Sequence, residues 1–186
     1  CLTLVHSGIV YPKERDPTPL FAALGKLSAS GRLPKGRLKV RFRAAVHEDL
    51  LRQLAANHGV ADITEIVPAI PYRAALAEML RADGLLVMQA SGCNDQIPAK
   101  IYEYLRARRP IVALTDPIGD TAGALFAAGI RSIAPLDQRE AIEAILLRFV
   151  FQDLDGTTAA DAAIAAASRE DRTAQLAAFL ERTTAA

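Results

Sequence analysis

Short apolar runs alternate with amphipathic segments along most of the chain, and this alternation limits the folds that the sequence can adopt. The runs Leu85–Met88 and Ile111–Leu114 contain no polar residue. Continuous apolar runs of this length are typical of strands buried on both faces of a parallel sheet. Between such runs, apolar residues recur at helical spacing, as Leu76, Met79 and Leu80 do. Because parallel strands need helical crossovers, the pattern predicts a doubly wound, Rossmann-like α/β domain.

The alternation also predicts where ligands bind. Strands are expected at 2–5, 38–42, 63–67, 85–88, 111–114 and 132–134, and helices at 19–27, 48–57, 72–81, 99–107, 121–128 and 141–151. In open parallel sheets, ligands bind beyond the carboxyl ends of the strands. The candidate loops are therefore those that follow strands: 6–16, 44–47, 68–71, 89–97 and 115–120.

The sequence changes character after Asp153. Residues 156–158 (Gly-Thr-Thr) break the pattern, and an alanine-rich stretch follows at 159–167. Beyond it, the spacing of apolar residues predicts a terminal helix over 170–182 that needs a surface to pack on. We therefore expect a Rossmann-like domain at 1–153 and a C-terminal helical extension at 154–186.

The first residues suggest that more protein precedes them. The chain starts with Cys1, and Leu2–Val5 already reads as a buried strand. A strand without any lead-in is unusual at the start of a natural protein. We therefore expect an upstream part that this chain does not include.

Composition excludes several classes of function. The 22 Lys and Arg residues nearly balance the 21 Asp and Glu residues, which argues against a nucleic-acid binder. Six basic residues between Arg32 and Arg43 are expected to form a solvated edge. The chain has two cysteines, no zinc-ligand spacing and no apolar run of the ~20 residues that a membrane span needs. We expect a cytoplasmic protein. The full-length enzyme could attach peripherally to the inner face of the membrane.

Common nucleotide and catalytic motifs are absent. His6-Ser7-Gly8 follows the first strand in place of GxGxxG, and the chain has no P-loop. Ala90-Ser91-Gly92 lacks the first glycine of a nucleophile elbow. These absences argue against a nicotinamide-dependent dehydrogenase, an ATPase and an α/β-hydrolase.

The most informative stretch is 89–114, in which a loop of small residues opens a helix. Pro98 is expected in the first helical turn, where proline costs no hydrogen bond. Asn94 or Asp95 can cap that helix. Free N–H groups and the positive end of the helix dipole would then form an anion site that suits a diphosphate.

Glu103 follows Pro98 by five residues, about 7.5 Å along the helix axis. Helical side chains lean toward the N-terminus, so this carboxylate can accept both hydroxyls of a ribose next to the diphosphate. Lys100 shares its helix face and could neutralise a phosphate or orient Glu103. The alternative is that Lys100 and Glu103 form only an exposed helical ion pair, and that Asp95 is only a cap.

The stretch resembles the retaining GT-B glycosyltransferases related to sucrose synthase and glycogen synthase. Their C-terminal domain carries an acidic residue, seven residues and then a glutamate, a spacing that Asp95 and Glu103 reproduce. Tyr-Glu-Tyr-Leu-Arg-Ala-Arg-Arg-Pro-Ile-Val at 102–112 continues this frame. The version with Pro98, Lys100 and the Tyr-Glu-Tyr run at 102–104 looks like a bacterial subgroup involved in surface polysaccharides. The resemblance covers about 2–150 and includes the first-strand loop at Gly8.

Three positions depart from the family pattern. Asp95 replaces a glutamate, and Arg108 stands where glycine is usual. Relatives often have an Arg and a Lys after the first-strand glycine, whereas Ile9 follows Gly8 here. The nearby cations are Lys13 and Arg15.

The resemblance implies a donor site for a UDP-, GDP- or ADP-sugar, with no metal and no tightly bound cofactor. Gly8 would allow close approach of the diphosphate, Lys100 would be the phosphate or orienting cation, and Glu103 would bind the ribose. Further contacts are expected from Ala69 and Ile70 to the base, and from Asn94, Asp95, Gln96 and Ile97 to the transferred sugar or phosphates. No catalytic residue is assigned, although Asp95 could touch the donor sugar.

The resemblance further implies the C-terminal half of an enzyme that transfers a hexose with retention. An N-terminal domain, absent from this chain, would bind a saccharide or lipid-linked acceptor, and the isolated domain would be inactive. Two other functions stay open: a nucleotide-sugar epimerase of GT-B architecture, and a non-catalytic α/β module that binds nucleotides or a protein. The residues specify neither base nor sugar.

Overall fold

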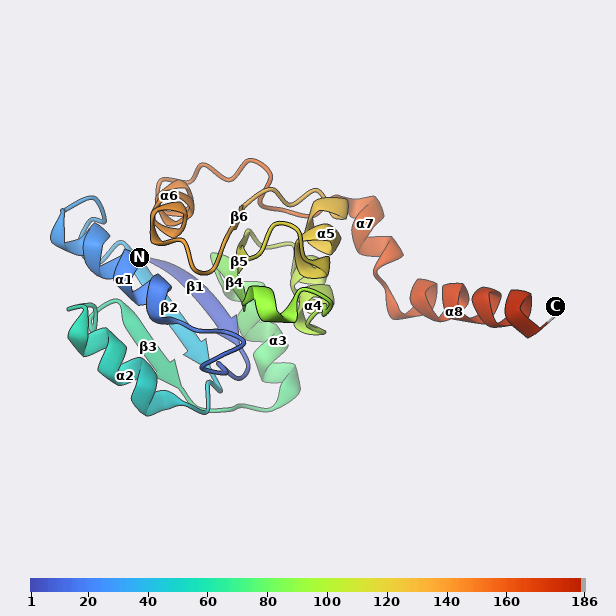
Figure 1. Ribbon diagram of the computed structural model, residues 1–186, viewed down its shortest axis with the longest axis horizontal. Helices are drawn as coiled ribbons and strands as arrows, with labels where there is room; N and C mark the ends of the chain where they lie inside the picture. The colour runs from blue at the N-terminus through green and yellow to red at the C-terminus, as the bar shows by residue number, and fades with distance from the viewer. Residues whose placement is uncertain (185–186) are drawn as a thin grey trace.

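A computed structural model describes residues 1–184 and has a six-stranded, all-parallel sheet at its centre (Figure 1). The strands are β1 (Leu2–Ser7), β2 (Leu38–Arg43), β3 (Thr64–Val67), β4 (Gly84–Gln89), β5 (Ile111–Thr115) and β6 (Ile133–Ala134). Their spatial order is β3-β2-β1-β4-β5-β6, with every neighbouring pair parallel. The predicted doubly wound α/β fold is confirmed.

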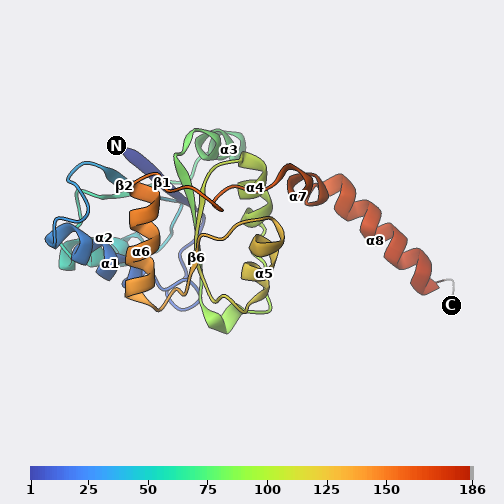
Figure 2. The same cartoon turned by 90° about the horizontal axis from the view of Figure 1, so that it is seen from above.

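Helices cover both faces of the sheet (Figure 2). One face is covered by α1 (Thr18–Ala29), α2 (Glu48–Asn57) and α6 (Arg139–Val150), and the other by α3 (Tyr72–Arg81), α4 (Lys100–Ala107) and α5 (Asp120–Ala127). Two apolar cores result, because alternate residues of each strand point to opposite faces. Thus Leu4 packs in the first core and Val5 in the second.

The strand order reverses between β1 and β4, where the ladder is short. Only Leu4 with Gly84 and Val5 with Leu85 are paired between these strands. Beyond them, side chains take over the hydrogen bonds: His6 Nδ1 lies 3.0 Å from the Leu86 carbonyl, and the Ser7 N–H donates to the Tyr104 hydroxyl at 3.0 Å. A topological switch point of this kind is where doubly wound folds bind ligands.

The basic stretch 32–43 is not a uniformly solvated edge, as the sequence had predicted. Arg41 and Arg43 lie on the face of β2 that α3 covers, with side chains 31% and 12% exposed. Both form ion pairs with Glu78 of α3, and Arg41 also pairs with Glu65. The prediction failed because carboxylates from β3 and α3 neutralise these cations, which charge counting along one strand does not reveal.

The C-terminal segment first follows the domain and then leaves it. Residues 154–160 form hydrogen bonds with the domain, and one of these is donated by the Ile111 N–H to the Thr157 carbonyl at 2.8 Å. After α7 (Asp161–Ala166), the helix α8 (Arg169–Thr184) extends away from the domain (Figures 1 and 2). The predicted terminal helix is confirmed, and its apolar side chains are exposed. None of the helices within residues 1–184 is long and apolar enough to cross a membrane.

Arg108 gives a stability prediction. It ends α4 in the left-handed region at φ +54°, a conformation that costs an L-residue about 1–2 kcal/mol relative to glycine. Its side chain makes only an exposed ion pair with Asp161. We expect Arg108→Gly to raise the free energy of unfolding by about 1 kcal/mol, and the melting temperature by about 2–4 °C. The control Arg108→Ala removes the ion pair but keeps the strain, so calorimetry showing that Gly is no more stable than Ala would refute this account.

Candidate functional site

The N-terminus of α4 lies at the carboxyl edge of the sheet, after the loop that follows β4. The helix starts at Lys100, one residue after the predicted start: its cap is Ala99, no side chain caps it, and Pro98 precedes the cap. The expectations that Pro98 occupies the first turn and that Asn94 or Asp95 caps the helix are therefore wrong. Within residues 1–184, no protein acceptor takes the N–H groups of Ala99 and Lys100. Two donors at the positive end of a helix are thus available to an anion.

The cap prediction failed because Asn94 has other partners. Its Nδ2 donates to Asp116 Oδ2 at 2.9 Å, and its carbonyl accepts the Asp120 N–H at 2.7 Å. These bonds tie the loop after β4 to the loop after β5. The neighbouring Gln96 carbonyl accepts bonds from Gln89 and Thr121. The loop is held rigidly by groups that sequence spacing alone does not connect.

Gly8 and Lys100 meet at this edge. Gly8 follows β1 with φ +115°, a backbone conformation that L-residues rarely adopt, and its N–H donates to the Arg43 carbonyl at 2.9 Å. A Cβ on Gly8 would lie 3.1 Å from Lys100 Nζ. Glycine therefore permits the backbone conformation of this turn, and its lack of a side chain leaves space next to the lysine.

Lys100 Nζ lies 3.2 Å from His6 Nε2 and has no ion pair with Glu103. The predicted alternative, an exposed helical ion pair between Lys100 and Glu103, is therefore not formed within the described residues. Burial, reinforced by the nearby Arg15 guanidinium and opposed by Glu103, lowers the pKa of Lys100 to about 7. Among the described residues, no carboxylate forms a salt bridge with Lys100.

Arg15 adds a second cation to the same place. Its Nη1 donates to the Ile9 carbonyl at 2.7 Å, and its guanidinium lies 5.2 Å from the centroid of the Tyr11 ring. Of the two cations that the sequence offered after Gly8, the structure therefore brings Arg15 back to the glycine loop. Lys13 is exposed.

Glu103 lies one helical turn beyond Lys100 and accepts a hydrogen bond from the Tyr72 hydroxyl at 2.8 Å. Tyr72 is the first residue of α3 and follows Ala69 and Ile70, the residues predicted to contact a base. The loop after β3 and the Glu103 carboxylate are thus brought together. The hydrogen bond and the negative charge of Glu103 raise the pKa of Tyr72.

The remaining predicted residues lie in the loop that joins β4 to α4. Asp95 and Ile97 are exposed, and Gln96 is exposed apart from its bonded carbonyl. Because the Asn94 side chain is turned to Asp116, it does not face Gly8. The structure therefore places Lys100 next to Gly8 and Glu103 one helical turn further along α4, with Asp95, Gln96 and Ile97 exposed in the preceding loop.

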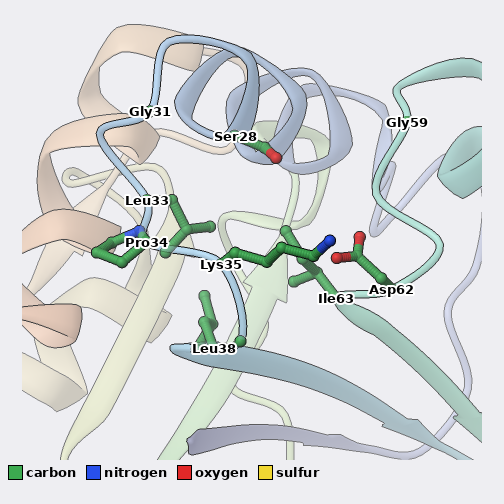
Figure 3. A pocket seen from close by; sticks show the side chains of 10 residues that line it. Ser28, Gly31, Leu33, Pro34, Lys35, Leu38, Gly59, Asp62 and Ile63 are labelled. Carbon is green, nitrogen blue, oxygen red and sulfur yellow. The ribbon is translucent and has the colours of Figure 1, made fainter.

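Among the hollows of the described residues, one lies away from this site and another adjoins it. A cavity of about 370 Å³ sits at the opposite, amino edge of the sheet, where Lys35 and Asp62 face one another near the start of β2 (Figure 3). It has no helix N-terminus comparable to that of α4, and its Gly31 and Gly36 have nothing within 4 Å of an added Cβ. This cavity lacks the features of an anion site.

The second hollow, of about 780 Å³, runs between α3, α4 and the start of α8. Tyr72 and Glu103 lie among its lining residues, so it adjoins the candidate site. Arg172 of α8 closes part of it, with its Nη2 bonded to the Tyr102 hydroxyl at 3.1 Å. Across residues 1–184, no three His, Cys, Asp or Glu side chains gather as a metal site.

Sequence reasoning missed His6, Tyr72 and Tyr104. His6 is fully buried near the end of β1. A sequence signal was available: a histidine that directly follows the apolar residues Leu4 and Val5 and is the penultimate residue of the strand. Tyr104 carried no signal, because its bond to the Ser7 N–H joins residues 97 apart in the chain.

No protein-family model matches the sequence, and no curated protein is significantly similar to it in sequence. Solved structures do share its fold. Sucrose-phosphate synthase from Thermosynechococcus elongatus superposes with a TM-score of 0.73 at 11% identity, covering 99% of this chain and 46% of that protein. α,α-Trehalose-6-phosphate synthase from Burkholderia multivorans gives 0.72 at 14% identity, covering 99% and 43%.

HepE from Anabaena, solved in complex with UDP-glucose, gives a TM-score of 0.68 at 16% identity. The match covers 97% of this chain and 49% of HepE. This chain thus spans less than half the length of each of these three structures. Its six-stranded parallel sheet with helices on both faces is the Rossmann-like fold found in these GT-B glycosyltransferases.

Proposed function

We propose that this chain binds the donor of a glycosyltransferase, a nucleoside diphosphate sugar, at the carboxyl edge between β1 and β4. The observation that carries the proposal is the grouping of Gly8, Lys100 and Glu103 at the switch point. A close-approach glycine, a cation and a carboxylate one helical turn apart match a diphosphate joined to a ribose. HepE, whose structure holds UDP-glucose, shares the fold over nearly the whole chain, which supports this assignment.

In this proposal each group has a separate task. The N–H groups of Ala99 and Lys100 and the Lys100 ammonium bind the diphosphate across Gly8, and Arg15 adds positive charge. Glu103 accepts the ribose hydroxyls, and Ala69 and Ile70 contact the base. The transferred sugar extends toward Asp95, Gln96 and Ile97. Asn94 contacts the sugar or the phosphates through its backbone.

The chemistry then follows from electrostatics. Transfer breaks the bond between the anomeric carbon and the diphosphate oxygen, so negative charge develops on the leaving diphosphate. Cations and helix N–H groups placed there stabilise that charge without a protein nucleophile. We propose that the acceptor, a saccharide or a lipid-linked saccharide, binds a second domain preceding this chain, and that transfer proceeds with retention in the cytoplasm.

Calorimetric titration of the domain with UDP, GDP and ADP tests the binding step and identifies the base. We expect one nucleoside diphosphate to bind clearly better than the others, and UDP-glucose or a related sugar nucleotide to compete with it. No binding of any of the three at millimolar concentration would contradict the proposal.

Transfer itself requires a longer protein that includes the preceding domain. Incubation of that protein with the preferred sugar nucleotide should yield a glycosylated acceptor. Inversion at one sugar carbon without transfer would instead indicate an epimerase. Binding without any turnover would indicate a non-catalytic module.

A further inference from the structure

His6 is buried beneath the candidate diphosphate site and has no role in the chemistry proposed above. It is the penultimate residue of β1 and is fully buried, with its ring 6.2 Å from that of Phe42. Burial and the nearby Lys100 hold the pKa of His6 well below its usual value. The ring is therefore neutral at physiological pH and carries a single N–H.

The hydrogen bonds define which nitrogen carries that proton. Nδ1 lies 3.0 Å from the Leu86 carbonyl, which can only accept, so Nδ1 is the donor. Nε2 is then left with a lone pair, and it lies 3.2 Å from Lys100 Nζ. The β4 backbone thus fixes the tautomer of His6, and His6 presents an acceptor to the lysine.

We propose that His6 is a positioning residue, which holds the Lys100 ammonium next to Gly8 as the receptor for the diphosphate. The inference rests on the proposed function, because it concerns the same anion site. Without the acceptor at Nε2, nothing within hydrogen-bond distance in the described chain holds Nζ next to the glycine. The long lysine side chain would then be free to turn toward solvent.

The charges around Lys100 give this arrangement a measurable consequence. His6 faces it from β1, Arg15 from the loop after β1, and Glu103 from its own helix; Tyr104 is buried on α4 and bonded to Ser7. With a pKa of about 7, Lys100 is mostly neutral at pH 8. A bound diphosphate favours the charged form, so the pKa rises on binding and the protein takes up a proton.

Titration with UDP at pH 8 in two buffers of different ionisation enthalpy measures this uptake. We expect uptake approaching about one proton per UDP in the unmodified chain. Lys100→Arg should bind UDP without uptake, since arginine stays charged. As the pH rises from 7 to 9, affinity of the unmodified chain should fall, because protonating Lys100 becomes harder.

Two substitutions of His6 test its two hydrogen bonds one at a time. His6→Asn keeps an N–H for the Leu86 carbonyl but removes the acceptor for Lys100, whereas His6→Gln can keep an acceptor near the position of Nε2. We expect His6→Asn to weaken UDP binding about tenfold and to abolish the proton uptake. His6→Gln should retain most of both, and the control His58→Asn, at the end of α2, should change neither.

A measurement on the unmodified chain covers the case in which a His6 variant does not fold. Nitrogen-15 spectra of the histidine rings should show His6 as the Nδ1–H tautomer, with an Nε2 resonance that shifts when UDP is added. An Nε2–H tautomer, or an unperturbed Nε2 resonance with UDP bound, would overturn the inference. So would wild-type affinity and uptake in folded His6→Asn. Failure of the unmodified chain to bind any of UDP, GDP and ADP would instead contradict the proposed function.

Discussion

Replacing Glu103 with alanine is expected to weaken UDP binding by about 100-fold. In the proposed site this carboxylate accepts two ribose hydroxyls, and hydrogen bonds to a charged group contribute about 1.5–3 kcal/mol each. Losing about 3 kcal/mol in total corresponds to that change in Kd. Calorimetric titration measures it directly, and folding should be little affected because the Tyr72 bond is exposed.

Two matched variants show whether the effect belongs to the carboxylate. Glu103→Gln keeps the shape and one acceptor, so its loss of affinity should be intermediate. Tyr72→Phe removes the protein partner of Glu103 but leaves the carboxylate in place, and its Kd should stay within about threefold of the unmodified value. If Glu103→Ala binds UDP normally, Glu103 does not contact the ribose.

Replacing Gly8 with alanine is expected to lower both UDP affinity and stability. An L-residue at φ +115° is strained, which should lower the free energy of unfolding by about 1–3 kcal/mol. The added Cβ would also lie 3.1 Å from Lys100 Nζ, so the lysine must move from the place where the diphosphate binds. We expect the Kd for UDP to rise at least about tenfold.

Control substitutions at two other glycines distinguish backbone strain from steric blocking of the diphosphate site. Gly36 has φ +71° and open space around an added Cβ, so Gly36→Ala should lower stability without changing Kd. Gly92 lies in the loop after β4, has no positive φ and also has open space, so Gly92→Ala should change little. Unchanged UDP affinity of Gly8→Ala would show that the anion does not approach this glycine.

Much of the fold could be predicted because each element carries its own local signal. The apolar runs at β4 and β5 are uninterrupted, and the apolar residues of α3 recur at helical spacing, so both signals can be read within a few residues. Glycine at the end of β1 and the position of Glu103 relative to the start of α4 also follow from short-range spacing. These signals predicted that Gly8 and Lys100 lie at one edge of the sheet, and the structure brings these two residues next to one another.

Contacts between distant segments could not be predicted in the same way. The His6–Lys100 bond joins residues 94 apart, and the Arg43–Glu78 pair joins β2 to α3. Asn94 looked like a cap because caps are recognised by residue type, but its partner Asp116 comes from another loop. Strand order and side-chain direction decide these contacts, and neither appears in a linear pattern.

The proposed function depends most on the binding of a nucleoside diphosphate at the carboxyl edge of the sheet. The most direct test is a titration of nitrogen-15-labelled protein with UDP, followed by assigned backbone amide resonances. We predict that the largest shifts occur at Gly8, Ile70, Ala99, Lys100 and Glu103. Shifts confined to the opposite cavity, at Gly36 and Ile63, or no shifts with UDP, GDP or ADP at millimolar concentration, would contradict the proposed function.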